Sequence, residues 1–122
     1  MKLQQRILMV LRKRDSGGTM TNKEKAQMIQ AVIEHPGRER TYYSLLEDLG
    51  DLEGNYSDYM TTEPINCNEE LQRVKNADYE LCTALLTAIL REDHFSNGSF
   101  QRRQRAGQVD EILKRMVAEL NK

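Results

Sequence analysis

The residues with the clearest chemical potential are Asp93 and His94, which follow Glu92 where an apolar segment of the chain ends. A histidine oriented by a carboxylate can act as a general acid or base near neutral pH. The same residues also fit a polar helix end, where Arg91 and a charged His94 face the negative end of the helix dipole and Asp93 pairs locally. Because no serine or cysteine is placed beside them as a nucleophile, the pattern favours a helix end and leaves an enzyme as an open alternative.

Metal-binding and cofactor-binding motifs are missing from the sequence, including the glycine-rich loops that bind phosphates and dinucleotides. The acidic stretch that begins at Asp51 has the composition of a calcium loop, but Gly54 takes the fourth position and Thr62 takes the twelfth, where calcium needs a carboxylate. Cys67 and Cys82 form no C-x-x-C pair of the kind that holds zinc. We therefore expect no metal and no cofactor, with Cys82 in the core and Cys67 half exposed.

Charged residues are unevenly divided along a chain whose total charge is only −1. Residues 1–40 contain nine basic and four acidic residues, residues 41–80 contain two and ten, and residues 81–122 contain seven and five. The middle third is therefore strongly acidic, and it lies between two basic ends. Within residues 47–63 there are six acids and no base.

This acidic segment predicts a protein-binding surface. Tyrosine offers a large contact area at low entropic cost, and carboxylates steer a basic partner toward the surface. Alternatively, the segment packs against the protein's own basic first helix, and the sequence leaves both arrangements open. The candidate partner-binding residues are Asp51, Glu53, Tyr56, Asp58 and Tyr59.

Two basic clusters support an alternative function, that of a nucleic-acid-binding accessory protein. Arginine and lysine on one face can contact phosphates and give salt-sensitive binding without sequence preference. Few aromatic residues lie among these bases, and the isoelectric point of about 6.1 is not that of a typical nucleic-acid binder. The clusters consist of Arg12, Lys13 and Arg14 near one end and Arg102, Arg103 and Arg105 near the other.

Apolar residues recur at helical spacing through most of the chain, and the positions of glycine, proline and capping residues divide it into segments. An apolar segment from about residue 81 to residue 90 predicts a central helix that is buried on several sides. The residues between about 50 and 66 keep no helical period and predict a long ordered loop. The other predicted helices cover residues 2–14, 22–34, 41–49, 68–75, 100–106 and 108–121.

Together these segments predict an all-α fold, a single compact domain of five to six helices over residues 1–122 with a long ordered loop in the middle. No apolar run approaches the length that crosses a bilayer, and the first residues do not have the pattern of a signal peptide, so we expect a cytoplasmic protein without a membrane partner. The amphipathic first and last helices also fit pairing with a second copy of the chain as a homodimer.

The last third of the chain resembles a known family. The motif consists of Leu85-Leu86-Thr87, then Arg91, Asp93, Phe95 and Gly98, then Gly107 and residues 112–116. Over residues 81–117 it resembles a small uncharacterised family, a domain of unknown function found in bacteria and their phages. The resemblance implies no known reaction. It implies that Arg91, Asp93, Phe95 and Gly98 form a shaped turn between helices, with Phe95 inserted in the core and Arg91 paired to Asp93.

From these observations we expect a non-enzymatic protein-interaction module. The small size and the family resemblance indicate a protein encoded by a phage or another mobile element. Such a protein would bind and inhibit a basic host protein, for example a defence nuclease as an anti-CRISPR protein does, through the acidic segment that bears the tyrosines.

Overall fold

The computed structural model describes residues 20–52 and 54–122 of the chain. The predicted helix at residues 2–14, with Arg12, Lys13 and Arg14, lies outside the described residues, and so does Glu53. Within the described ranges the chain forms one compact domain of six α-helices and two short 3-10 helices, and no strand is found there. The predicted all-α fold class is therefore confirmed.

The first described helices begin and end at the residues that local chemistry favours. α2 (Asn22–Glu34) starts at a capping box, in which the Thr21 hydroxyl accepts from the Glu24 amide and the Glu24 carboxylate accepts from the Thr21 amide. α3 (Glu39–Leu49) starts slightly before the predicted position and stops at Gly50, which has a φ of 77° that glycine adopts without strain.

The expected long loop is present between α3 and the next α-helix, with one turn of 3-10 helix, η1 (Tyr56–Tyr59), within it. The short helix predicted at residues 68–75 is split into α4 (Cys67–Glu70) and the 3-10 helix η2 (Leu71–Asn76). The last three helices are α5 (Tyr79–Phe95), α6 (Ser99–Arg105) and α7 (Gln108–Leu120).

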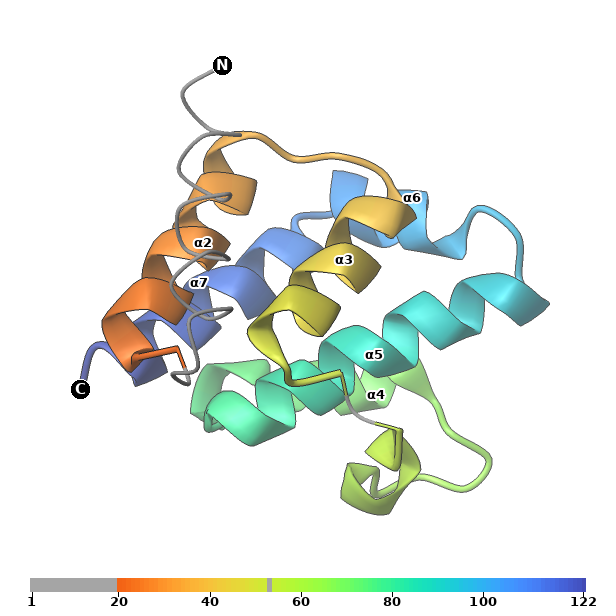
Figure 1. The fold of residues 1–122 in the computed structure, drawn as a ribbon. Helices are drawn as coiled ribbons and strands as arrows, with labels where there is room; N and C mark the ends of the chain where they lie inside the picture. The colour runs from red at the N-terminus through yellow and green to blue at the C-terminus, as the bar shows by residue number, and fades with distance from the viewer. Residues whose placement is uncertain (1–19, 53) are drawn as a thin grey trace.

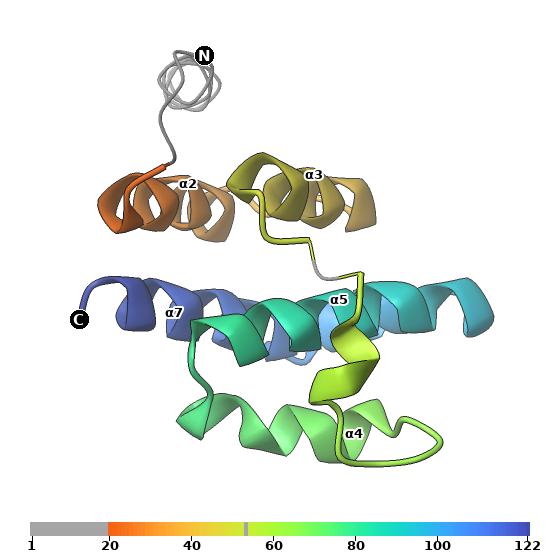
Figure 2. The same cartoon turned by 60° about the horizontal axis from the view of Figure 1, so that its bottom comes forward.

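These helices are arranged in three layers (Figure 1 and Figure 2). α2 and α3 form one outer layer, α5 and α7 lie in the middle, and α4 with η2 forms the other outer layer. Every residue of α5 from Cys82 to Leu90 is buried, because neighbours cover this helix on both sides. The prediction that α5 is the central helix is confirmed.

The end of α5 differs from the expectation that the family resemblance gave. The helix continues to Phe95, and this side chain is 92% exposed instead of inserted in the core. Asp93 lies four residues after the buried Ile89 and three after the buried Leu90, so it shares their inward face of the helix. Phe95 lies on the outward face of the same turn. The aromatic residue that fills the core here is Phe100, which is fully buried in α6 and packs against Tyr42 with 5.2 Å between the two ring centroids.

The apolar face of the last helix, α7, packs against other elements of the same chain. The apolar residues of α7 are buried against α2, α5 and η2, so this face is not available to a second copy of the chain. The last helix therefore does not offer the free apolar face on which the predicted pairing depended, and the first helix, its other element, lies outside the described residues. The buried residues are Val109, Ile112, Leu113, Met116 and Leu120.

Within the described residues, no helix combines the length and the apolar character that a bilayer crossing requires.

Candidate functional site

Asp51, the first of the acidic residues expected to bind a partner, is engaged inside the fold. Its Oδ2 atom lies 2.8 Å from Nζ of Lys25 in α2 and accepts a hydrogen bond of 2.6 Å from the Tyr79 hydroxyl in α5. Burial and this bond to Asp51 both raise the pKa of Tyr79 above its ordinary value. Asp51 therefore ties α2 to α5, and its charge is neutralised by a base of the same chain.

The 3-10 helix η1 presents the other candidate residues in different directions. Tyr56 packs partly buried against the core, whereas Asp58 is exposed and accepts a long hydrogen bond of 3.5 Å from the Asn55 side chain. The Tyr59 hydroxyl donates to the Glu80 carboxylate at 3.3 Å. Asp58 from η1 and Glu80 from α5 are thus both exposed, and Tyr59 is joined to the second of them.

A buried carboxylate, Glu70, holds the chain that follows η1. Only 1% of Glu70 is exposed, and its oxygens accept hydrogen bonds from the backbone amides of Thr61 and Thr62 at 2.9 and 2.7 Å. The hydroxyl groups of both threonines donate to the same carboxylate. Burial alone would raise the pKa of Glu70, but the hydrogen bonds from Thr62 and Arg73 outweigh it and lower this pKa to about 2.

Arg73 completes this anchor. One of its guanidinium nitrogens lies 2.8 Å from a Glu70 oxygen and also donates to the Tyr59 carbonyl at 2.9 Å. Arg73 therefore links Tyr59, the last residue of η1, to the buried carboxylate of Glu70. Sequence reasoning assigned Glu70 only to the acidic first turn of a helix, because the threonines that it binds lie eight and nine residues earlier in an irregular segment.

We call Asp58, Tyr59 and Glu80 the acidic surface. It lies where η1 packs against α5. The residues that fix its backbone, Glu70 and Arg73, satisfy one another. Asp58 and Tyr59 therefore lie on a segment whose backbone is held in place from below.

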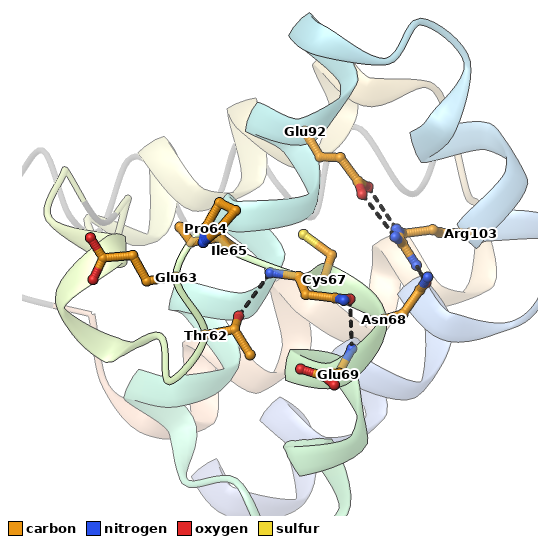
Figure 3. Close-up of a pocket in the computed structure, with 10 residues that line it drawn as sticks. Thr62, Glu63, Pro64, Ile65, Cys67, Asn68, Glu69, Glu92 and Arg103 are labelled. Atoms are coloured by element: carbon orange, nitrogen blue, oxygen red, sulfur yellow. Dashed lines mark hydrogen bonds and ion pairs between the residues drawn. The ribbon is translucent and has the colours of Figure 1, made fainter.

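A pocket of about 530 Å³ lies next to this region, between the segment 62–69 and the end of α5 (Figure 3). Pro64, Ile65 and Cys67 contribute its apolar wall, while Glu63 and Glu69 are exposed at its edge. Contrary to expectation, Cys67 is buried. Burial, reinforced by the neighbouring Glu92, raises the pKa of the Cys67 thiol to about 11, so this thiol is not activated as a nucleophile.

Glu92 and Arg103 face one another across the inner end of the pocket, as Figure 3 shows. The guanidinium binds both carboxylate oxygens, at 2.7 and 2.8 Å, and also donates to the Asn68 side chain at 2.9 Å. The hydrogen bonds from Arg103 hold the pKa of Glu92 below its ordinary value. Glu92 and Arg103 thus line the inner end of the pocket as an ion pair whose two charges cancel.

The same pairing divides the basic cluster that was considered for nucleic-acid binding. Arg103 is committed to Glu92, while Arg102 and Arg105 remain exposed on α6. Arg102 donates a long bond of 3.4 Å to the Ser96 hydroxyl. Two exposed arginines on a helix of seven residues form a smaller basic area than the sequence indicated.

Asp93 and His94 do not act on one another in the fold. One oxygen of Asp93 accepts from the backbone amides of Gly98 and Phe100, each at 3.1 Å, so this carboxylate caps the start of α6. The ring of His94 meets the Tyr43 hydroxyl at 3.3 Å on another side of α5. The implied pair between Arg91 and Asp93 is replaced by these backbone bonds, and Asp93 does not orient the His94 ring.

Within the part of the chain that the structure describes, no three histidine, cysteine, aspartate or glutamate side chains gather as metal ligands would.

Residues 7–122 match the model of a protein family described as a family of unknown function (DUF6508). This match is longer than the resemblance noted over residues 81–117. No significant match to the chain is found among curated proteins or among solved structures.

Proposed function

The chain belongs to a family of unknown function, DUF6508, and we propose that it is a non-enzymatic protein-interaction module that binds a basic protein through the acidic surface. The observation that carries this proposal is the anchor formed by Glu70 and Arg73, which fixes the chain around η1. The anchor leaves the carboxylates of Asp58 and Glu80 exposed.

A surface that is fixed before binding loses little conformational entropy when a partner docks. Exposed carboxylates attract a basic partner and raise its association rate, and a tyrosine between them supplies contact area without many rotatable bonds. Asp51 has no part in this contact, because Lys25 and Tyr79 already occupy its carboxylate. The binding residues are therefore Tyr59 with Asp58 and Glu80.

The proposal includes the nature of the partner. An acidic surface fits the basic channel in which a nuclease holds nucleic acid, so we propose that the module inhibits a basic host protein such as a defence nuclease. A cytoplasmic protein encoded by a phage or another mobile element would meet such a partner in the host cell. The resemblance of residues 81–117 to a family found in bacteria and their phages supports this part of the proposal.

The test compares two variants with the same change of net charge. In the first, Asp58→Lys and Glu80→Lys reverse the acidic surface. In the second, Glu34→Lys and Glu111→Lys reverse two exposed acids on α2 and α7. The tagged wild-type protein is used to capture its partner from cells that naturally contain it, and the purified partner is then titrated with all three proteins by calorimetry.

We expect the first variant to weaken binding by at least ~10-fold and the second to change it by less than ~3-fold, since only close charge pairs contribute strongly to affinity. The helical circular dichroism of all three proteins should be the same. Equal dissociation constants for the two variants would contradict the proposal.

A further inference from the structure

Phe95 is the most exposed large apolar side chain among the described residues, at 92%. A single exposed apolar residue is common on protein surfaces, so its surroundings have to indicate whether it binds anything. It lies in the last turn of α5, four residues after the exposed Arg91. The exposed Arg102 is joined to Ser96, the residue that follows Phe95. Phe95 therefore has one exposed arginine a helical turn before it and another bonded to the residue that follows it, and we call these three residues the Phe95 tip.

The Phe95 tip and the pocket of Figure 3 have complementary features. The pocket has room for an aromatic ring, and Pro64 and the 37% exposed Ile65 give it an apolar side. Because Glu92 and Arg103 neutralise one another at its inner end, the remaining charge comes from Glu63 and Glu69 at its edge. An aromatic side chain flanked by positive charges fits such a pocket.

The tip and the pocket are also neighbours on the same molecule. Glu92 lines the pocket and precedes Phe95 by three residues of the same helix, so the two positions are about 5–6 Å apart at Cβ. Phe95 is nevertheless solvent-exposed, and within its own chain it does not fill the pocket. When an anchor and its receptor lie side by side, two copies related by a twofold axis can satisfy both contacts at once, and the assembly closes at two.

We propose that the chain forms a twofold dimer in which Phe95 of each copy enters the pocket of the other. Arg91 and Arg102 of one copy then face Glu63 and Glu69 of its partner. The acidic surface around Tyr59 has no part in these contacts, so this dimer and the proposed binding of a basic protein are independent.

The test measures the mass of the full chain by sedimentation equilibrium between ~1 and ~300 μM, a range chosen because interfaces smaller than standard size are weak. We expect the wild type to approach the dimer mass at the upper end. Phe95→Ser should raise the dimer dissociation constant by at least ~30-fold, the effect typical of a central aromatic residue in an interface. A wild type that stays monomeric, or a dimer that Phe95→Ser leaves unchanged, would overturn the proposal.

A charge exchange identifies the two surfaces that meet. One variant carries Arg91→Glu and Arg102→Glu, so that both its tip and its pocket are acidic. The other carries Glu63→Arg and Glu69→Arg, so that both are basic. Each variant alone should be monomeric, and an equimolar mixture should form a heterodimer, because each tip then meets a pocket of opposite charge. A mixture that remains monomeric would show that the tip and the pocket are not partners.

Discussion

At the scale of single residues, Glu70 shows how a buried charge is stabilised in this protein. The carboxylate is taken out of water, which by itself is unfavourable, and the amides of Thr61 and Thr62 with the Arg73 guanidinium compensate this loss. The exposed Glu69 next to it has none of these partners in the described structure. Two adjacent glutamates of the same type therefore contribute very differently to stability.

We predict that Glu70→Gln lowers the free energy of unfolding by about 3 kcal/mol, because the variant leaves the Arg73 guanidinium without its carboxylate and places an amide donor against other donors. Urea denaturation at pH 7 measures this loss. Glu69→Gln is the matched control and should stay within about 0.5 kcal/mol of the wild type. Equal losses in both variants would contradict the assigned role of Glu70.

The effect of Glu70 should also depend on pH. Its pKa is about 2 in the folded protein and ordinarily 4.5, so its stabilising effect is complete above about pH 4.5 and is lost as the pH falls toward 2. The difference in unfolding free energy between the wild type and Glu70→Gln should therefore shrink over this interval. Urea titrations at several pH values measure it, and a difference that is constant with pH is the contrary result.

Cys67 yields a second prediction at this scale. Since burial and Glu92 raise the pKa of its thiol to about 11, very little thiolate is present at pH 8. Iodoacetamide should therefore modify Cys67 far more slowly in the folded protein than in the protein unfolded in urea, as followed by mass spectrometry. Cys82, whose pKa burial raises to about 12, serves as the internal reference for a core thiol. Labelling of Cys67 at the rate of a free thiol would show that the pocket wall opens.

At the scale of elements, the junction of α5 and α6 depends on a carboxylate that lies outside the helix that it caps. Gly98, the residue before α6, has a φ of 88° and no side chain to accept a hydrogen bond. Asp93 supplies the acceptor from the preceding helix and fixes the amide of the buried Phe100. The relative position of the two helices is thus coupled to the packing of the core.

We predict that Asp93→Ala lowers the free energy of unfolding by about 1–2 kcal/mol, the usual cost of losing a helix cap together with a buried acceptor. Asp93→Asn keeps an acceptor oxygen in place and should lose less than half of that amount. Thermal and urea unfolding measure both variants. If Asp93→Asn is as unstable as Asp93→Ala, the negative charge and not the cap geometry is the important property.

At the scale of the whole molecule, Asp51 joins parts of the chain that are distant in sequence. Lys25 precedes it by 26 residues and Tyr79 follows it by 28, and both contact the same carboxylate oxygen. The contact connects the outer layer that contains α2 to the central α5. Part of the negative charge in the middle of the chain is therefore used within the fold.

Substitutions at Asp51 and at Asp58 should consequently have different effects on the stability of the fold. We predict that Asp51→Asn lowers the free energy of unfolding by about 2 kcal/mol, since it leaves the half-buried Lys25 without its partner. Asp58→Asn, an exposed residue of the same segment, should change stability by less than about 0.5 kcal/mol. Chemical denaturation of the two variants is the measurement, and a reversed order would assign the structural role to η1 instead.

The sequence by itself determined the all-α class and most helix boundaries in the described residues. Helical periodicity, the capping box at Thr21 and the glycine at residue 50 depend only on neighbours within about one turn, so these features can be read along the chain. α2 covers the predicted residues 22–34. The predicted central helix stopped near residue 90, whereas α5 continues to Phe95. In this added turn the helical geometry directs Phe95 outward, although its apolar side chain suggested a place in the core.

Only the tertiary structure decided which charged residues remain exposed. Asp51 and Asp58 look alike in the sequence, as do Arg102 and Arg103, yet one member of each pair forms an ion pair within the chain and the other is exposed with only a long hydrogen bond to a neutral side chain. The bound members find their partners between 11 and 28 residues away, a distance that no local pattern encodes. Electrostatic pairing depends on separation in space, and packing of the helices alone establishes that separation.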